Sequence, residues 1–260
     1  MKHNRILIDA DILVYRYGQA CTEDCFGTTV TLIENAKAAF RDKLEYIKAD
    51  YPGHSPMLAL SNGKCFRYDI FKAYKAHRSP TPDVVRELKE WVRSEYANIM
   101  LESPSKELVL EADDILGLHC GPGDIIMSDD KDMLTIPGRH AKFHSEGEVF
   151  VIPETIANGN FWEQVLTGDS ADGYIGCRGI GPSAANRILE AALKAGIPQY
   201  DACLLTYLSN RQTEEDLIVS CRLAYIYRKG DNPDKLWEPP TREERLRSWF
   251  DFCEYLGTEA

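Results

Sequence analysis

Four short apolar runs, separated by helical stretches, constrain the fold of this chain more than any other feature. The runs cover residues 6–8, 57–60, 125–127 and 149–152, and their length is typical of buried β-strands. Between them lie stretches such as 31–49, in which apolar residues recur at steps of three and four, as they do on one face of a helix. Strands that alternate with helices predict an α/β fold with a mainly parallel sheet.

Acidic residues directly follow two of these expected strands. Asp9 and Asp11 come after the first run, and Asp129, Asp130 and Asp132 come after the third. In parallel sheets, ligands gather beyond the carboxyl ends of the strands. Carboxylates are also the oxygen ligands that Mg²⁺ and Mn²⁺ prefer. The pattern therefore predicts a metal site at this edge of the sheet.

Two further acidic groups occur elsewhere in the chain. Glu111, Asp113 and Asp114 open an expected helix, and Asp169 and Asp172 lie in a segment bounded by glycines. Any one such group is explained equally well as a helix cap or a solvated surface. Several together favour convergence on bound cations, because packed carboxylates repel one another strongly without them.

A basic segment with an interleaved tyrosine lies between the second and third expected strands. Tyr74-Lys75-x-x-Arg78 places two bases three residues apart, on one face if the segment is helical. In such a segment Lys75 can neutralise a phosphate group and Arg78 can grip it, while Tyr74 can stack on an unpaired nucleobase. The alternative is a solvated basic helix that the tyrosine anchors to the core. Further on, Asp83 is expected to cap a helix over 84–96.

A glycine-rich turn over 176–181 precedes an expected helix over 183–194. Glycines allow another backbone to approach closely, and exposed amides at the start of a helix bind phosphate. Pro182 suits the first helical turn, and Arg178 and Arg187 can add phosphate contacts that do not read sequence. A Gly-x-Gly sequence alone is usually only a tight turn. Its position after the last acidic pair favours DNA binding.

In chain order, these motifs resemble the flap endonuclease superfamily, and in particular its bacteriophage-encoded 5′-to-3′ exonucleases. The likeness spans about residues 5–195. It is carried by Ile8-Asp9-Ala10-Asp11, Phe66-Arg67, Tyr74-Lys75-Ala76-His77-Arg78, Glu111-Ala112-Asp113-Asp114, Ser128-Asp129-Asp130-Lys131-Asp132, Gly168-Asp169-Ser170-Ala171-Asp172-Gly173 and Gly179-Ile180-Gly181-Pro182.

The resemblance implies an α/β, PIN-like core with a mainly parallel central sheet in residues 1–152, including a helical arch at about 64–100. It implies a helical C-terminal region over 153–260, with a helix-three-turn-helix DNA-binding element at about 165–195. Two residues of the acidic groups, Asp11 and Asp129, have no role in the family pattern. Where relatives often carry another Asp after the second strand, this chain has Ser61-Asn62. Where some carry a lysine before the Gly-Asp motif, it has Glu163-Gln164.

The resemblance also implies two bound ions, Mg²⁺ or Mn²⁺, and a possible K⁺ at the glycine turn. The first divalent site would be formed by Asp9, Glu111, Asp113 and Asp114, and the second by Asp130, Asp132, Asp169 and Asp172. The residues expected to be catalytic are Asp9, Lys75, Arg78, Asp113 and Asp130. The residues expected to bind DNA are Arg67, Tyr74, Lys75, Arg78, Arg178, Gly179, Gly181 and Arg187.

The net charge of −11 at first argues against a nucleic-acid partner. Without the eight carboxylates assigned to metals, −11 becomes −3, and two divalent ions would add +4. Residues 64–78 also form a local patch of +4, because they hold five bases and a single acid, Asp69. The five bases are Lys64, Arg67, Lys72, Lys75 and Arg78. The charge distribution is therefore compatible with phosphate binding.

The function expected from these motifs is 5′-3′ exonuclease action on duplex DNA by two-metal-ion phosphodiester hydrolysis that leaves 5′-phosphates. Structure-specific flap endonuclease activity and a role in DNA replication and repair accompany it in the family. The expected partner is double-stranded DNA with a 5′ end or flap, and RNA–DNA hybrids are a further possibility. No apolar run approaches the roughly 20 residues that cross a bilayer, and the N-terminus does not resemble a signal peptide. A cytoplasmic location follows, in the host if a phage encodes the chain.

Other functions fit the sequence less well. A haloacid-dehalogenase-type phosphatase would use Asp9 as its nucleophile, but the spacing of the later aspartates is wrong and such an enzyme needs no basic patch. A non-catalytic DNA-binding scaffold would require broken metal ligands, whereas all eight are present. The eight cysteines are scattered, without a C-x-x-C pair, and are expected to be reduced thiols rather than zinc ligands.

Overall fold

The computed structural model describes residues 4–25 and 28–245, and its chain divides into two compact units. The first unit comprises the described parts of 1–65, 78–154 and 226–234. The second comprises the described parts of 66–77, 155–225 and 235–260. Within the described residues, no helix is both long and apolar enough to cross a membrane.

A five-stranded sheet forms the centre of the first unit. In spatial order it consists of β4 (His54–Ala59), β1 (Asn4–Asp9), β5 (Ile125–Met127), β6 (Gly138–Ala141) and β7 (Phe150–Ile152). The first four of these strands run parallel and β7 runs antiparallel to β6. The expected α/β fold with a mainly parallel sheet is confirmed.

The structure contains a strand, β6, and a hairpin that the sequence did not predict. Strand β6 reads Gly-Arg-His-Ala and has no apolar run, although His140 is buried within it. The hairpin pairs β2 (Thr22–Cys25) with β3 (Thr28–Thr31), which are short and mostly polar. Periodicity detects strands through apolar side chains, so strands without them escape it.

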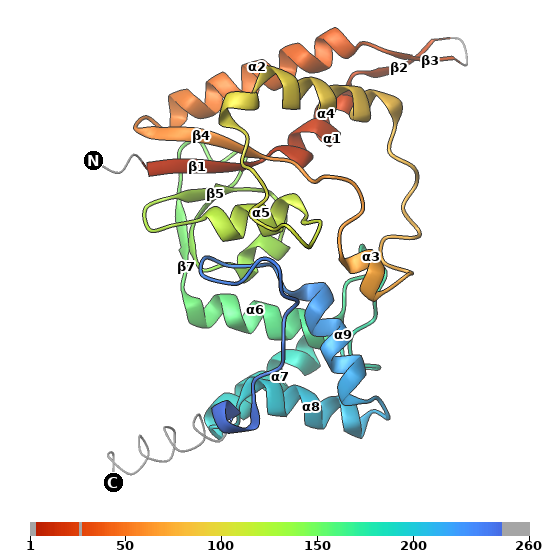
Figure 1. Cartoon of the computed structure of the whole chain (residues 1–260), viewed down its shortest axis with the longest axis vertical. Coiled ribbons are helices and arrows are strands. Elements are labelled where there is room, and N and C mark those ends of the chain that lie inside the picture. Colours follow the sequence, from red (N-terminus) through yellow and green to blue (C-terminus); the bar gives the residue numbers. More distant parts are fainter. Residues whose placement is uncertain (1–3, 26–27, 246–260) are drawn as a thin grey trace. The chain divides into compact units, whose positions relative to one another are not determined.

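Helices cover both faces of the sheet (Figure 1). Helices α1 (Ala10–Ala20), α2 (Ile33–Asp50) and α4 (Asp83–Glu95) pack together on one face, and α5 (Ala112–His119) contacts β1 and β4 from the other. The apolar core of the first face includes Ile6, Ile8, Phe40, Leu44, Val85 and Leu88, all without solvent exposure. An added Cβ at Gly18 of α1 would lie 2.8 Å from Val85 Cγ2, so α1 and α4 pack closely.

Helix α5 is also covered by the chain segment 226–234. The carbonyl oxygen of Tyr227 lies where a Cβ on Gly117 would be, so only glycine allows this approach. Asp234 accepts hydrogen bonds from Ser105 Oγ at 2.9 Å and from Lys106 N at 2.7 Å. These contacts hold both α5 and the loop before it within the first unit.

The second unit is helical. It contains α3 (Arg67–Ile70), α6 (Glu154–Thr167), α7 (Pro182–Lys194), α8 (Gln199–Ser209) and α9 (Glu214–Ala224). The expected helix after the glycine turn is present as α7.

Aromatic side chains form much of the core of the second unit. Phe161, Trp162 and Tyr200 pack against Trp237 with ring centroids 6.2 to 6.3 Å apart. The Tyr207 hydroxyl donates to Val165 O at 2.7 Å. The proline- and charge-rich sequence around Trp237, which the motifs left without a role, therefore contributes to this core.

The expected helical arch is not one helical segment. After α3, residues 72–77 form turns, and Lys75 has a left-handed φ of 52°. The condition under which Lys75 and Arg78 would share one helical face is therefore not met. The helix after this segment exists as α4, but Pro82 precedes it without a side-chain cap, and Asp83 pairs with Arg86 instead. Helix α4 packs on α1 and α2 because Val85 and Leu88 are buried against them.

Candidate active site

Asp9 lies at the carboxyl end of β1, where the strand passes directly into α1. Its Oδ1 accepts from Ile12 N at 3.4 Å and caps the helix, and its Oδ2 accepts from Ser128 Oγ at 2.9 Å. The second bond follows from strand register, because Ile8 pairs with Met127 and so brings Ser128 beside Asp9. Asp9 is 3% exposed. A carboxylate is therefore held almost buried at the sheet edge where the sequence predicts a metal site.

The acidic residues after β5 separate into two groups. Asp130 N donates to Ser128 Oγ at 3.1 Å, and Asp132 N donates to Asp130 Oδ1 at 2.9 Å. This turn keeps Asp130 next to the strand end. Asp129 instead accepts from Arg16 Nη2 at 2.6 Å and Phe143 N at 3.1 Å.

These contacts give Asp129 a different charge environment. Its burial opposes ionisation, but the Arg16 guanidinium and the Phe143 amide outweigh it and hold the pKa of Asp129 below its usual value. Asp129 is therefore an ionised carboxylate with its own cation, consistent with the absence of a role for it in the family pattern.

The start of α5 carries the acidic group Glu111, Asp113 and Asp114. Asp114 Oδ2 accepts from Glu111 N at 3.1 Å, and the Glu111 side chain accepts from the Asp114 amide, which together form a capping box. Asp114 has no solvent exposure, and its Oδ1 lies 3.5 Å from Tyr227 N. The Asp114 oxygens thus serve to cap the helix and to face Tyr227. Asp113 lies between Glu111 and Asp114, the two residues of the capping box.

Asp9, Asp113 and Asp130 influence one another electrostatically. Burial, then the charge of Asp11, raises the pKa of Asp9 to about 7, and Asp130 adds to the shift. Burial, then the charges of Asp9 and Asp130, raises the pKa of Asp113 well above its usual value. Like charges raise each other's pKa only when they are close. The ends of β1 and β5 and the start of α5 therefore bring these three carboxylates into one neighbourhood.

The donor chemistry of this neighbourhood fits a hard divalent cation, because carboxylate oxygens are its preferred ligands. Among the described residues, however, no three His, Cys, Asp or Glu side chains are placed to coordinate one ion.

Asp169 and Asp172 lie in the second unit, in the turn after α6. Asp169 is 4% exposed, and its Oδ1 accepts from Ala171 N at 2.6 Å. Gly168 precedes it with a φ of 72°, and an added Cβ there would lie 2.4 Å from the Ile175 carbonyl carbon. Glycine is therefore needed for this tight turn.

Tyr74 and Lys75 contact Asp172 within the second unit. The Tyr74 hydroxyl donates to Asp172 Oδ2 at 2.9 Å, Lys75 Nζ lies 3.8 Å from Asp172 Oδ1, and Lys75 N donates to Asp172 O at 2.8 Å. The ammonium group also lies 4.7 Å from the Tyr74 ring centroid. Tyr74, from its own segment, and Asp172, from the turn after α6, thus orient the Lys75 side chain.

Two of the expected DNA contacts have other roles in this geometry. Tyr74 is 1% exposed, so its ring is an anchor in the core and does not fit the stacking role expected of it. Arg67 is 2% exposed, and its guanidinium donates to Leu223 O at 3.0 Å and Tyr225 O at 2.7 Å. A buried arginine that satisfies backbone carbonyls does not fit a phosphate contact. The alternative of a tyrosine anchor describes Tyr74 better.

The remaining expected DNA contacts are exposed or partly exposed. Exposed positions include Arg78, Arg178, Gly179, Gly181 and Arg187. An added Cβ at Gly179 or Gly181 would meet nothing within 4 Å, which leaves the backbone of the turn open. This openness suits the approach of a phosphate backbone.

Gln212 holds this glycine turn through two hydrogen bonds. No sequence motif predicted this role. Its Nε2 donates to Gly176 O at 3.1 Å, and its Oε1 accepts from Arg178 N at 2.7 Å. Ser128, the residue that contacts Asp9, was also missed. Its position directly after a strand was a usable signal for Ser128, whereas Gln212 lies 34 residues from the turn it supports.

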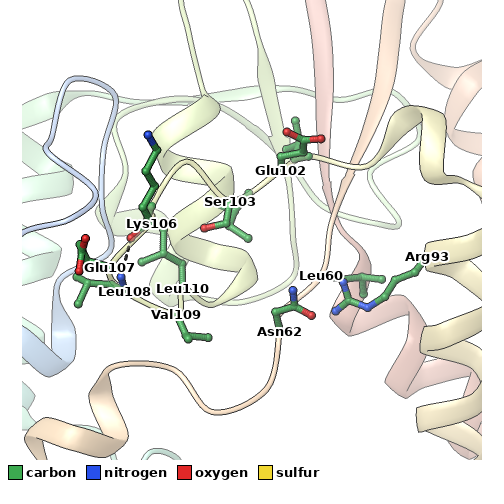
Figure 2. A pocket seen from close by; sticks show the side chains of 13 residues that line it. Leu60, Asn62, Arg93, Glu102, Ser103, Lys106, Glu107, Leu108, Val109 and Leu110 are labelled. Atoms are coloured by element: carbon green, nitrogen blue, oxygen red, sulfur yellow. Dashed lines mark hydrogen bonds between the residues drawn. The ribbon is translucent and has the colours of Figure 1, made fainter.

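A cavity of about 480 Å³ lies in the first unit beside the turn that follows β4 (Figure 2). It is lined by Asn62, Arg93 and the loop 101–110 that leads to α5. In Figure 2 the Arg93 side chain extends toward Leu60 and Asn62.

With this geometry established, comparison with known proteins defines the class. The chain matches the family described as 5′-3′ exonuclease, N-terminal resolvase-like domain, over residues 4–158. That match spans more than half of the 260 residues. The chain belongs to this 5′-3′ exonuclease family.

Individual relatives agree with this membership. DNA polymerase I of Rhizobium leguminosarum is 30% identical over 156 residues, which is 54% of this chain and 15% of that protein. This chain spans about a third or less of the length of the curated relatives it matches.

Solved structures show the same fold. The bacteriophage T5 5′-exonuclease with bound zinc ions has a TM-score of 0.56 at 14% identity, covering 96% of this chain and 98% of that one. The T5 D15 flap endonuclease in a pseudo-enzyme-product complex with DNA and metal ions has a TM-score of 0.51 at 14% identity, with the same coverage.

Proposed function

We propose that this chain is a metal-dependent nuclease that hydrolyses DNA from 5′ ends and leaves 5′-phosphates. The observation that carries this proposal is that Ser128 Oγ joins Asp9 and the Asp130 backbone at the carboxyl ends of β1 and β5. The charges of Asp9 and Asp130 also act on Asp113 at the start of α5. Membership of the 5′-3′ exonuclease family supports the same chemistry.

Two divalent cations, Mg²⁺ or Mn²⁺, fit the all-oxygen donor set. Bound together, such ions activate water and stabilise the leaving oxygen of a phosphodiester. The assignment of Asp132, Asp169 and Asp172 to the second ion rests on the resemblance alone. The proposed ligands are Asp9, Glu111, Asp113 and Asp114 for one ion and Asp130, Asp132, Asp169 and Asp172 for the other. The metal-bearing T5 neighbours support the need for a metal.

Asp114 is the least accessible of these proposed ligands. It is fully buried, and its oxygens already face the Glu111 and Tyr227 amides. A role through bound water, or in orienting the helix that carries Asp113, suits it better than direct coordination.

Basic side chains of the protein would bind the phosphate. Lys75, oriented by Tyr74 and Asp172, would lie against the scissile phosphate, and Arg78 would grip it bidentately. The open turn at Gly179 and Gly181 would hold the duplex backbone.

The finer assignments follow the resemblance. They are duplex DNA with a 5′ end or flap as substrate, RNA–DNA hybrid as a second substrate, K⁺ at the glycine turn, and action in the cytoplasm. The phosphatase alternative is not favoured. Asp9 is almost buried and accepts from Ser128, which does not suit a nucleophile that must reach a substrate.

Cleavage of 5′-labelled duplex and flap DNA, with Mg²⁺ or Mn²⁺ and with chelator, tests this proposal. Asp130→Asn should reduce cleavage by roughly 100- to 1000-fold, because metal-ion charge stabilisation is worth several kcal/mol. Duplex binding, measured by fluorescence anisotropy, should be retained. Asp113→Asn should behave alike.

Glu87→Gln is the matched control, since it removes one negative charge at an exposed position of α4. It should cleave like the wild type. Full cleavage by Asp130→Asn, or hydrolysis of small phosphate monoesters without cleavage of DNA, would reject the proposal.

A further inference from the structure

Ser61, in the turn after β4, is held by hydrogen bonds from three separate elements. Its Oγ accepts from Ala112 N of α5 at 2.9 Å. Its own N–H donates to Asp11 Oδ2 of α1 at 2.9 Å, and its carbonyl accepts from Arg93 Nη2 of α4 at 2.6 Å. A single residue therefore joins three helices to the carboxyl end of β4.

The bond to Ala112 closes a gap in the capping of α5. The first amides of a helix have no acceptor within the helix. The capping box serves the amides of Glu111 and Asp114, and Ser61 serves the amide of Ala112 between them. Since Ser61 is 51 residues away in sequence, this bond fixes the start of α5 to the sheet.

Asp11 accepts a hydrogen bond from Ser61 and is itself fixed in place by Lys89. Its second oxygen, Oδ1, accepts from Lys89 Nζ at 2.5 Å. The two side chains are only about a fifth exposed, so the pair is partly shielded from solvent. Both carboxylate oxygens of Asp11 thus have partners, which gives this residue a use other than binding an ion.

We infer that Ser61 is a positioning residue for the carboxylates of α5, and that Asp11 and Lys89 hold Ser61 in place. Ala112 lies between Glu111 and Asp113, so a shift of its amide moves both side chains relative to Asp9. This inference rests on the proposed function, in which these carboxylates bind divalent cations. Residues that orient metal ligands typically contribute 10- to 100-fold to metal affinity or activity.

Two measurements on the DNA-free protein test it. Amide hydrogen exchange at Ala112 reports directly on the hydrogen bond from Ala112 N to Ser61 Oγ. The Ser61→Ala variant should accelerate this exchange. Mn²⁺ binding, followed by electron paramagnetic resonance, should weaken by about 10-fold or more in the same variant. Ser61→Thr keeps the hydroxyl and should restore both properties. Ser55→Ala, at an exposed position of β4, should change neither.

Asp11→Asn provides a second route if Ser61→Ala folds poorly. It keeps the size of the side chain but removes the charge that binds Lys89, and it should weaken Mn²⁺ binding less than Ser61→Ala does. Unchanged Ala112 exchange or unchanged Mn²⁺ affinity in Ser61→Ala, with Asp130→Asn losing Mn²⁺, would overturn the inference alone. A wild-type protein that binds no Mn²⁺ would overturn the proposed function together with this inference.

Discussion

Asp9, Asp11 and Asp129 all lie at or just beyond strand ends, yet their surroundings give them different properties. Asp11 faces Lys89, and Asp129 faces Arg16. Burial and the neighbouring carboxylates raise the pKa of Asp9 to about 7. The charge state and availability of each carboxylate thus depend on which side chain lies opposite it. That partner is 78 residues away for Asp11 and 113 for Asp129.

Lys75→Ala should slow cleavage by about 100-fold with little loss of duplex binding, because a preorganised cation acts mainly on charge that develops in the transition state. The comparison is single-turnover cleavage against binding measured by anisotropy. Lys72→Ala is the matched control, since Lys72 lies in the same segment with a highly exposed side chain. Equal rates for the two variants would contradict the role of Lys75.

His140 should make the first unit sensitive to acid. Burial is the main cause that lowers the pKa of His140, whose Nε2 lies 2.9 Å from Ile136 O and whose ring stacks on Phe150. In the unfolded chain the His140 side chain takes up a proton near pH 6.5, whereas in the folded chain it stays neutral until a lower pH. This contribution to stability is therefore present above about pH 6.5 and is lost as the pH falls toward the lowered value.

Urea unfolding at pH 7.5 and pH 5.5 checks this expectation. The free energy of unfolding should fall between these two pH values by a larger amount in the wild type than in His140→Gln. An equal fall in both proteins would assign the acid sensitivity to other groups.

At the scale of elements, two helix starts illustrate how local capping and distant contacts combine. Helix α5 carries its own capping box, and its Ala112 N–H also donates to Ser61 Oγ. Helix α7 begins with Pro182 after the glycine turn, and Gln212 holds that turn from the residue before the cap of α9. The local signals for both helices are visible in sequence, whereas the distant supports are not.

Gln212→Ala should loosen the glycine turn, because it leaves Arg178 N and Gly176 O without this partner. We expect a loss of about 1–3 kcal/mol in the free energy of unfolding, as for buried polar groups that lose a hydrogen bond. Duplex binding should weaken, while Mn²⁺ binding is unchanged. Chemical denaturation and anisotropy measure the two effects, with Gln19→Ala as an exposed control. Unaltered duplex affinity would remove the turn from the proposed DNA-binding surface.

At the scale of the whole molecule, the net charge of −11 makes cation binding a contribution to stability. Carboxylates that repel one another oppose folding until a cation offsets them. Mn²⁺ at 100 times its dissociation constant should stabilise the folded chain by about 2.7 kcal/mol. This corresponds to a rise of roughly 5–10 °C in Tm for a chain of this size.

Scanning calorimetry with Mn²⁺ and with chelator measures this shift. Asp130→Asn should reduce the Mn²⁺-dependent rise, and Glu87→Gln should preserve it. A rise of the same size in all three proteins would indicate that Mn²⁺ binds elsewhere.

Local patterns in the sequence were sufficient to predict the α/β class, three of the four parallel strands, several of the helices and the acidic groups at the strand ends. These features depend on local periodicity and on motif order, which a single chain displays directly. The folded chain was needed to show that Tyr74 and Arg67 are buried, that Lys75 lies in a turn, and that Asp11 and Asp129 pair with basic side chains of their own. Burial and charge pairing depend on residues distant in sequence, and chain folding brings those residues together.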